Sequence, residues 1–133
     1  MVYETTADAI PPASESAEAS RIARIRELND QLRTCRDPIA ALVMDGQLVV
    51  TRGIAALGNE FINHAVAAVR DFDAFTEDND PWGEHDCATL TVDGKDVIFK
   101  IDYYDPSMEH HTDDAADPKV TRRVLTIMLA EDW

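Results

Sequence analysis

Basic residues are scarce in this chain, and the scarcity is concentrated in one segment. The 133 residues include 26 acidic and 12 basic side chains, which gives a net charge of −14. Residues 71–117 contain 15 acidic side chains but only two lysines, so this segment alone carries a charge of −13. A field of that sign repels nucleic acid and anionic membranes, and it attracts cations and basic protein surfaces. We therefore expect no direct contact with nucleic acid or with a membrane.

Long apolar runs and cysteines are also scarce. No run reaches the roughly 18 apolar residues that a membrane-spanning helix needs, and the N-terminus lacks the basic and apolar segments of a secretion signal. Cys35 and Cys87 are too few for a disulfide scaffold. Hydrophobic residues nevertheless make up 45% of the chain, which is enough for a folded domain with a modest core. The composition indicates a cytoplasmic protein with reduced cysteines.

The chain divides into a short arm and one domain. Residues 1–18 are rich in Ala, Ser, Pro and acidic residues, which is typical of a flexible acidic N-terminal arm. Residues 19–133 are expected to form a single α+β domain that begins with a helix over residues 19–34. The apolar residues of this helix recur at spacings of three and four and form one stripe: Ile22, Ile25, Leu28 and Leu32.

Two Asp-Gly pairs mark the expected turns of the sheet. The pairs at residues 45–46 and 93–94 lie between short apolar runs, and both residue types tolerate positive φ, so each pair predicts a β-hairpin. A second helix is expected between the hairpins, beginning at Ile54 or Gly58 and ending near Phe72, because apolar residues again form one stripe.

A third helix is expected at the C-terminal end. Asp117 is a good N-cap, Pro118 suits the first helical position, and the following VLTIMLA is apolar almost all round. The resulting order is helix, hairpin, helix, hairpin, helix. We therefore predict an α+β fold in which a four-stranded antiparallel sheet has its helices packed on one face.

Several stretches resemble a bacterial domain family of unknown function. They are TRGIAALG, FDAFTEDNDPWGEHD, KIDYYD and DPKVTRRVLTIMLAEDW, and the resemblance extends over about residues 22–133. The family resemblance implies a small cytoplasmic protein that is often carried on plasmids and other mobile elements, with antirestriction genes as frequent neighbours. No activity of the family is established, so the resemblance assigns no catalytic residue.

The acidic segment itself is the main candidate for a functional surface. Carboxylates held on a rigid hairpin and its loops can imitate the phosphates of a duplex and occupy the Lys/Arg groove of a DNA-binding protein. We therefore predict an antidefence protein that inhibits a CRISPR effector complex or a restriction enzyme, with exposed aromatic residues as anchors. The predicted partner-binding residues are Glu77, Asp78, Asp80, Trp82, Glu84, Asp86, Asp102, Tyr104 and Asp105.

A metal-dependent phosphoesterase is the second hypothesis. Its ligands would be Asp78, Asp80, Asp86 and Asp102, with His85 as the base. An EF-hand fits this loop poorly, because Trp82 and Thr89 stand at two of its ligand positions, whereas a looser Mg²⁺ or Ca²⁺ site in the loop stays an alternative. The paired spacings of a zinc site are absent around His85, Cys87 and the histidines at 110–111. The acidic field would also repel a phosphodiester substrate. We therefore favour a non-catalytic protein and expect no cofactor or bound metal.

A plain regulatory module is the third hypothesis. In this case the chain would form a homodimer through the last helix, and the acidic residues would only keep the surface solvated. Polar substitutions at Val124 or Ile127 would then disturb function more than changes of charge.

Overall fold

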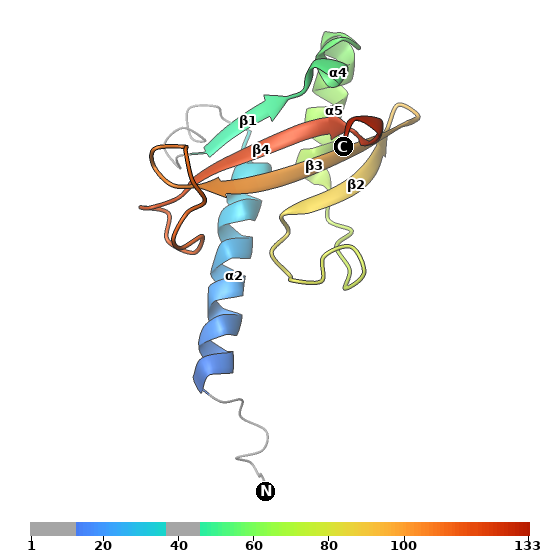
Figure 1. Cartoon of the computed structure of the whole chain (residues 1–133). Coiled ribbons are helices and arrows are strands. Elements are labelled where there is room, and N and C mark those ends of the chain that lie inside the picture. The colour runs from blue at the N-terminus through green and yellow to red at the C-terminus, as the bar shows by residue number, and fades with distance from the viewer. Residues whose placement is uncertain (1–12, 37–45) are drawn as a thin grey trace, which may run out of the picture.

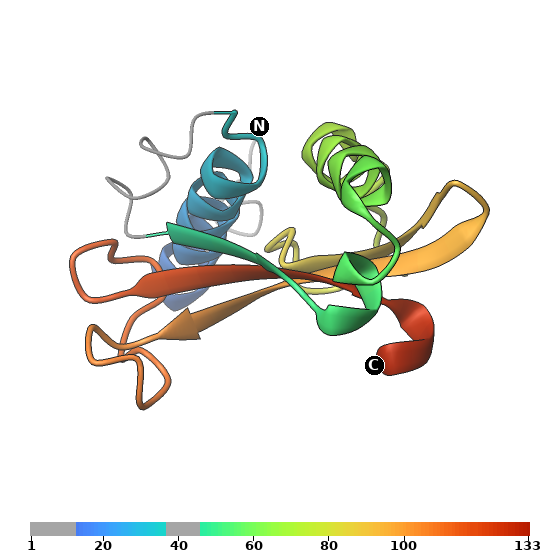
Figure 2. The ribbon, with the colours of Figure 1, turned by 90° about the horizontal axis from the view of Figure 1, so that it is seen from above.

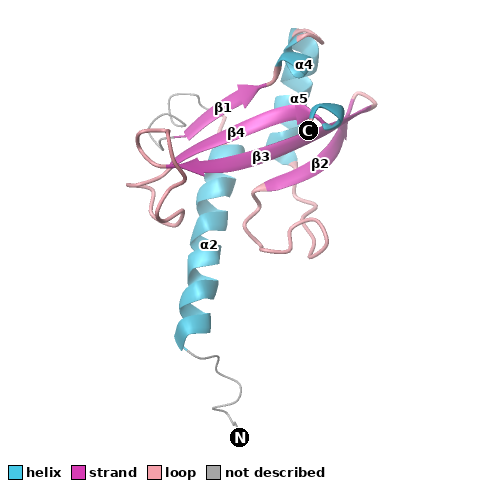
Figure 3. Ribbon diagram, viewed as in Figure 1, coloured by secondary structure: helices cyan, strands magenta, loops and turns pink. Residues whose placement is uncertain are grey.

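The computed structural model describes residues 13–36 and 46–133, which form an α+β fold (Figure 1, Figure 3). The long helix α2 precedes a sheet of four strands, and the shorter helices α4 and α5 connect the first strand to the others. The elements are α2 (Ala13–Arg33), β1 (Gly46–Val50), α4 (Arg52–Ala55), α5 (Asn59–Asp71), β2 (Cys87–Val92), β3 (Lys95–Tyr104), β4 (Arg122–Leu129) and the 3-10 turn η1 (Ala130–Asp132).

The sheet is mixed rather than antiparallel, so the predicted fold is wrong in this respect. The strand order is β1-β4-β3-β2, in which β1 runs parallel to β4 while the other two pairs are antiparallel. β1 pairs with β4 from Gly46 opposite Arg123 to Val50 opposite Ile127. The expected hairpin partner of β1, before the Asp-Gly pair at 45–46, lies outside the described residues. An Asp-Gly pair signals only a local turn, whereas the partner of β1 comes from about 75 residues further along the chain.

The predicted last helix is instead the strand β4, which is central in the sheet. An apolar run of this length is compatible with a buried helix or with a strand that is covered on both faces. Here Leu125 and Ile127 face the helices, and Met128 on the opposite face is also buried. The strand has hydrogen-bonded neighbours on both edges, and β-branched residues at Val124, Thr126 and Ile127 suit it.

Asp117 and Pro118, which were predicted to begin a helix, form a turn instead. The Asp117 carboxylate accepts a hydrogen bond from the backbone N–H of Lys119 at 2.9 Å, and the Asp117 carbonyl accepts one from the N–H of Val120 at 3.3 Å. The Asp-Pro pair thus forms a turn that leads into β4, because short polar side chains stabilise turns as well as helix starts.

The second predicted hairpin is confirmed. β2 and β3 pair in antiparallel register from Cys87 opposite Lys100 to Val92 opposite Lys95. Asp93 and Gly94 form the turn with φ values of 50° and 81°, as a two-residue hairpin loop requires. Alternate side chains of both strands face the core as the sequence pattern predicted.

Both long helices lie on the same face of the sheet, as the view from above shows (Figure 2). Their apolar residues and the inward-facing strand residues form one core. Its buried members are Leu32, Ile54, Phe61, Ala65, Val69, Ala88, Val92, Val97, Phe99, Ile101, Leu125, Ile127 and Leu129. α2 begins at Ala13, six residues before the predicted start of this helix, and α4 with α5 covers the predicted second helix. None of the helices in the described part of the chain is long and apolar enough to cross a bilayer.

Candidate functional site

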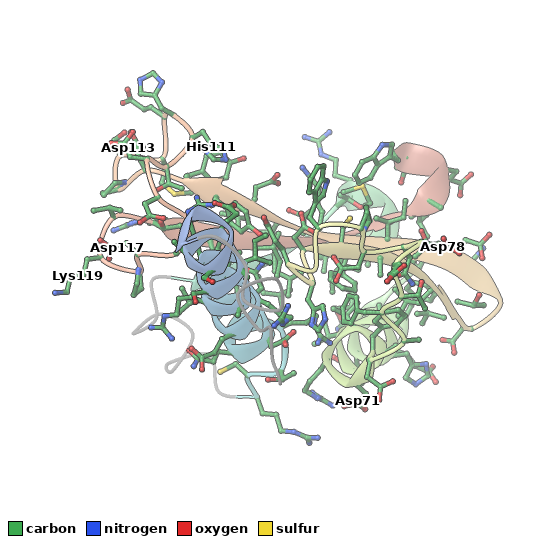
Figure 4. The ribbon with its side chains drawn as sticks, turned by 90° about the horizontal axis from the view of Figure 1, so that it is seen from below. Asp71, Asp78, His111, Asp113, Asp117 and Lys119 are labelled. Carbon is green, nitrogen blue, oxygen red and sulfur yellow. The ribbon has the colours of Figure 1, made fainter. Side chains whose placement is uncertain are left out.

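The loop between α5 and β2, residues 72–86, holds most of the predicted binding residues. At its tip the Asn79 side chain accepts a hydrogen bond from the Thr76 N–H at 2.8 Å, and the Thr76 hydroxyl accepts one from the Asn79 N–H at 3.2 Å. This turn leaves Glu77 and Asp78 exposed, and Figure 4 shows Asp78 pointing away from the body. Trp82 is also exposed, with 73% of its surface accessible. The tip therefore presents two carboxylates and an indole to solvent.

Asp80, in the same loop, is not part of the exposed surface. Its side chain is buried, and both carboxylate oxygens lie 3.3 Å from the backbone N–H of His85. The His85 Nε2 atom lies 3.7 Å from the same carboxylate. Asp80 therefore stabilises the loop, because a buried carboxylate needs such hydrogen bonds to offset its lost hydration.

His85 joins this loop to α2. Its Nδ1 atom lies 3.0 Å from the nearer carboxylate oxygen of Asp30, and its ring stacks on Phe75 with 3.8 Å between ring centroids. His85 adopts a φ of 56°, which a non-glycine residue adopts only when its surroundings favour it. The hydrogen bond to Asp30 and the ring stacking together hold the loop against the helix.

A buried polar cluster lies between α2 and the sheet. The Asn29 side chain donates to the Tyr103 hydroxyl at 2.7 Å and to the Glu84 carbonyl at 3.0 Å, and it accepts from Arg123 Nε at 2.8 Å. The Tyr103 hydroxyl donates to the Glu84 carboxylate at 2.8 Å. Glu84 is therefore committed to the fold, and the cluster links three segments that are far apart in the sequence.

Burial changes the ionisation of this cluster. Desolvation raises the pKa of the Tyr103 hydroxyl well above its usual value, so this group stays protonated and can donate to Glu84. Desolvation also lowers the pKa of Arg123, whose guanidinium lies 5.2 Å from the centre of the Tyr103 ring. A further hydrogen bond joins Arg123 to the Ala115 carbonyl.

Arg33 holds α2 against the end of α5. Its buried guanidinium donates to the carbonyls of Val69 at 2.9 Å and Phe72 at 2.6 Å, which belong to the last turn of α5 and its cap. It also bonds to the Asp30 carboxylate at 3.0 Å. The last carbonyls of a helix lack intrahelical partners and carry partial negative charge, so a buried cation suits this position.

A hollow of about 300 Å³ opens beside the C-terminal half of β3, beyond the last residue of β3 that pairs with β2. It is lined by Asp86, Ile101, Asp102, Tyr103, Tyr104 and His111. Burial and the neighbouring Glu84 raise the pKa of the Asp86 carboxyl. Asp102 forms a partly exposed ion pair with Lys100 at 2.7 Å.

Cys87 follows directly after the hollow. Burial and the adjacent Asp86 raise the pKa of its thiol. A raised pKa disfavours the thiolate, which is the nucleophilic form, so Cys87 is poorly suited to nucleophilic catalysis.

Asp105, the last of the predicted acidic residues, lies in the loop between β3 and β4. The Asp105 carboxylate accepts hydrogen bonds from the Ser107 hydroxyl at 2.7 Å and from the Glu109 N–H at 3.2 Å, and the Ser107 bond lowers the pKa of Asp105. Figures 1 and 4 show that the loops between β3 and β4 and the loop that carries Asp78 lie on opposite sides of α2. The nine predicted residues therefore do not form one continuous surface.

The hypothesis of a metal-dependent enzyme gains no support from the geometry. Among residues 13–36 and 46–133, no three Asp, Glu, His or Cys side chains form a group that could hold a metal ion. The four predicted ligands are separated instead: Asp78 is at the loop tip, Asp80 is buried beneath it, and Asp86 and Asp102 lie at the hollow. The homodimer hypothesis placed Val124 and Ile127 on a last helix, but both residues lie on the strand β4, and Ile127 is fully buried.

Sequence reasoning missed the polar residues that position these loops. Asn29 and Arg33 follow Ile25 at spacings of four, so they lie on the apolar stripe of α2 rather than on its solvated face. A polar side chain in such a stripe indicates a buried hydrogen-bonding role. The spacing was therefore a usable signal, although it could not have named the partners in the sheet.

The comparisons with known proteins agree with a family of unknown function. A family described as "Protein of unknown function (DUF3768)" matches residues 50–132, which is more than half of the chain and includes β2, β3 and β4 but only the last residue of β1. No curated protein and no solved structure matches the chain. α2 lies before the matched segment, although its Asn29 and Arg33 are buried against it. By this match the chain belongs to the DUF3768 family.

Proposed function

We propose that the chain is a non-catalytic inhibitor whose acidic surface occupies the DNA-binding groove of a host defence protein. The partner would be a restriction enzyme or a CRISPR effector complex. The observation that carries this proposal is the charge of −13 between residues 71 and 117. The part of this charge at the loop tip and the hollow would attract a basic groove and replace the electrostatic attraction that DNA would use.

The structure favours a smaller contact set than the sequence did. Asp80, Glu84 and Asp105 accept hydrogen bonds from within the chain, so they are less available to a partner. The remaining predicted residues are Glu77, Asp78 and Trp82 at the loop tip, and Asp86, Asp102 and Tyr104 around the hollow. A partner that reaches both groups would approach the side of the chain on which β2 is the edge strand.

The fold supports this role by holding the carboxylates still. The Asn29 cluster, the His85 contacts and Arg33 fix the acidic loop against α2. A preordered surface loses less conformational entropy on binding than a mobile acidic segment would. The family resemblance described above implies mobile elements with antirestriction genes nearby, which is a setting where such an inhibitor would be useful.

Affinity capture from nuclease-treated bacterial lysate tests the proposal. The immobilised chain is loaded at low salt and eluted in a rising salt gradient, with and without competing duplex DNA. We expect a DNA-binding protein that leaves at moderate salt and that DNA displaces, because contacts between opposite charges weaken as salt rises.

Two variants with the same loss of charge make the capture specific. The test variant carries Glu77→Gln, Asp78→Asn, Asp86→Asn and Asp102→Asn. The control carries Glu18→Gln, Glu27→Gln, Glu60→Gln and Glu131→Gln, all at exposed positions outside the acidic segment. The test variant should lose the captured protein and the control should retain it. Equal elution of both variants would refute the proposed surface.

A further inference from the structure

The hollow at the edge of β3 arises because β3 is longer than its neighbour. β2 pairs with β3 only as far as Lys100, and the next N–H along this edge, that of Ile101, still bonds to the Asp86 carbonyl at 2.7 Å. Beyond Ile101 this edge of β3 has no further pairing with β2, and Tyr104 forms only an isolated bridge with His111. The hollow of about 300 Å³ lies beside this unpaired stretch of β3, and Asp86 and His111 also line it. One wall is therefore formed by β3 in the sheet, and the other by the loop segments that carry Asp86 and His111.

The chemistry of the walls is that of a cation site. Asp86 and Asp102 contribute carboxylates, and Tyr103 and Tyr104 contribute aromatic rings. The His111 Nδ1 atom lies 2.8 Å from the Thr112 carbonyl. A carbonyl can only accept, so Nδ1 donates and Nε2 of the neutral ring remains an acceptor. The walls thus supply acceptors and aromatic surface. The Tyr104 hydroxyl can donate there, whereas the Tyr103 hydroxyl already donates to Glu84.

The folded chain carries an unfavourable interaction at this place. Burial and Glu84 raise the pKa of the Asp86 carboxyl, with smaller contributions from Asp80 and Asp102. An ionised Asp86 is therefore destabilising until a cation approaches it. Lys100 is already paired with Asp102, but a partly exposed pair of this kind contributes only about 0–1 kcal/mol and can be exchanged.

We propose that this hollow receives an arginine side chain of the protein partner. The inference rests on the proposed function, since it names the partner group that the acidic surface binds. Arginine fits better than lysine because its planar guanidinium can bond to a carboxylate through two N–H groups and stack on a tyrosine ring at the same time. Basic grooves that hold DNA are rich in arginine for the same geometric reason.

A peptide titration of the full chain tests the inference without the partner. Hexaarginine is added to 15N-labelled protein at low salt, and hexalysine is the comparison peptide. We expect saturable shifts at the amides of residues 101–104 and at His111, with weaker binding of hexalysine. Asp86→Asn should weaken hexaarginine binding by roughly tenfold, as expected for the loss of a hydrogen-bonded charge pair.

Asp71→Asn is the matched control. Asp71 is exposed, Figure 4 shows it far from His111, and its substitution removes the same charge. It should weaken binding by about twofold or less, because an exposed charge contributes little. Asp102→Asn is a second test variant in case Asp86→Asn perturbs the fold, and it should also weaken binding more than the control.

Three results would overturn the inference. They are shifts spread over all acidic loops, equal losses of hexaarginine affinity in Asp86→Asn, Asp102→Asn and Asp71→Asn, or equal affinity for the two peptides. Failure of the proposed function is separable from these. If hexaarginine binds at the hollow but lysate capture gives no DNA-competed protein, the arginine site stands and the inhibitor proposal fails. If capture succeeds but the Asp86 variant behaves as the control, the hollow is not the docking point.

Discussion

Asn29→Ala is expected to destabilise the fold strongly, although it removes only a small side chain. Asn29 is fully buried and takes part in hydrogen bonds with Glu84, Tyr103 and Arg123. Tyr103 keeps its bond to the Glu84 carboxylate, but the Arg123 Nε–H and the Glu84 carbonyl lose a partner. A stranded buried donor costs about 1–3 kcal/mol, and more when it is charged. We therefore expect a total loss of roughly 3–4 kcal/mol, which is a large part of the stability of an ordinary domain.

Urea denaturation at neutral pH measures this loss. With an m value of about 2 kcal/mol per molar, a loss of this size lowers the midpoint by roughly 1.5–2 M. Gln31→Ala is the control, since Gln31 is exposed on the same helix, and its effect should stay within about 0.5 kcal/mol. A loss below about 1 kcal/mol in Asn29→Ala, at unchanged m value, would refute the claim that the cluster holds α2 on the sheet.

Two further predictions concern ionisation. Asp86→Asn should raise the midpoint of thermal unfolding at neutral pH, because burial and Glu84 raise the pKa of Asp86 and disfavour its ionised form in the folded chain. The gain should vanish below about pH 4, where the unfolded chain is protonated as well, and an equal gain at acidic pH would contradict this origin. The hydrogen bond from His64 to Asp93 raises the pKa of the imidazole above 6.5, so the contact stabilises the fold at mildly acidic pH and is lost as pH rises through the folded pKa. An NMR titration should give a lower pKa for His64 in Asp93→Asn, and an unchanged value would show that the contact is absent in solution.

The C-terminal segment shows where pattern reasoning reached its limit. The run from Val124 to Leu129 is apolar enough for either a buried helix or a central strand, and Asp117-Pro118 can open a helix or form a turn. The choice was made by partners on both edges, β1 and β3, which lie far away in the sequence. Local propensity cannot report such pairings, because strand assignment depends on the neighbours that a strand finds.

In the candidate site, too, some features follow from local sequence and others depend on contacts between distant residues. The sequence located the acidic segment and correctly placed residues near 86 opposite those near 101, because a two-residue turn fixes the register of the hairpin. It could not separate the exposed Asp78 from the buried Asp80, two positions away. That difference comes from His85, whose backbone N–H bonds to Asp80 and whose ring bonds to Asp30 on α2.

The sequence by itself determined the charge asymmetry, the apolar stripe of α2 and the β2–β3 hairpin, since each depends on composition or on residues close together in the chain. Only the tertiary structure decided that β1 runs parallel to β4, that Asn29 meets Arg123 across 94 positions, and that Asp86 and Asp102 share a hollow. The physical reason is that these contacts depend on long-range packing of the helix and sheet, where burial and hydrogen-bond satisfaction select one arrangement from several that the local patterns allow.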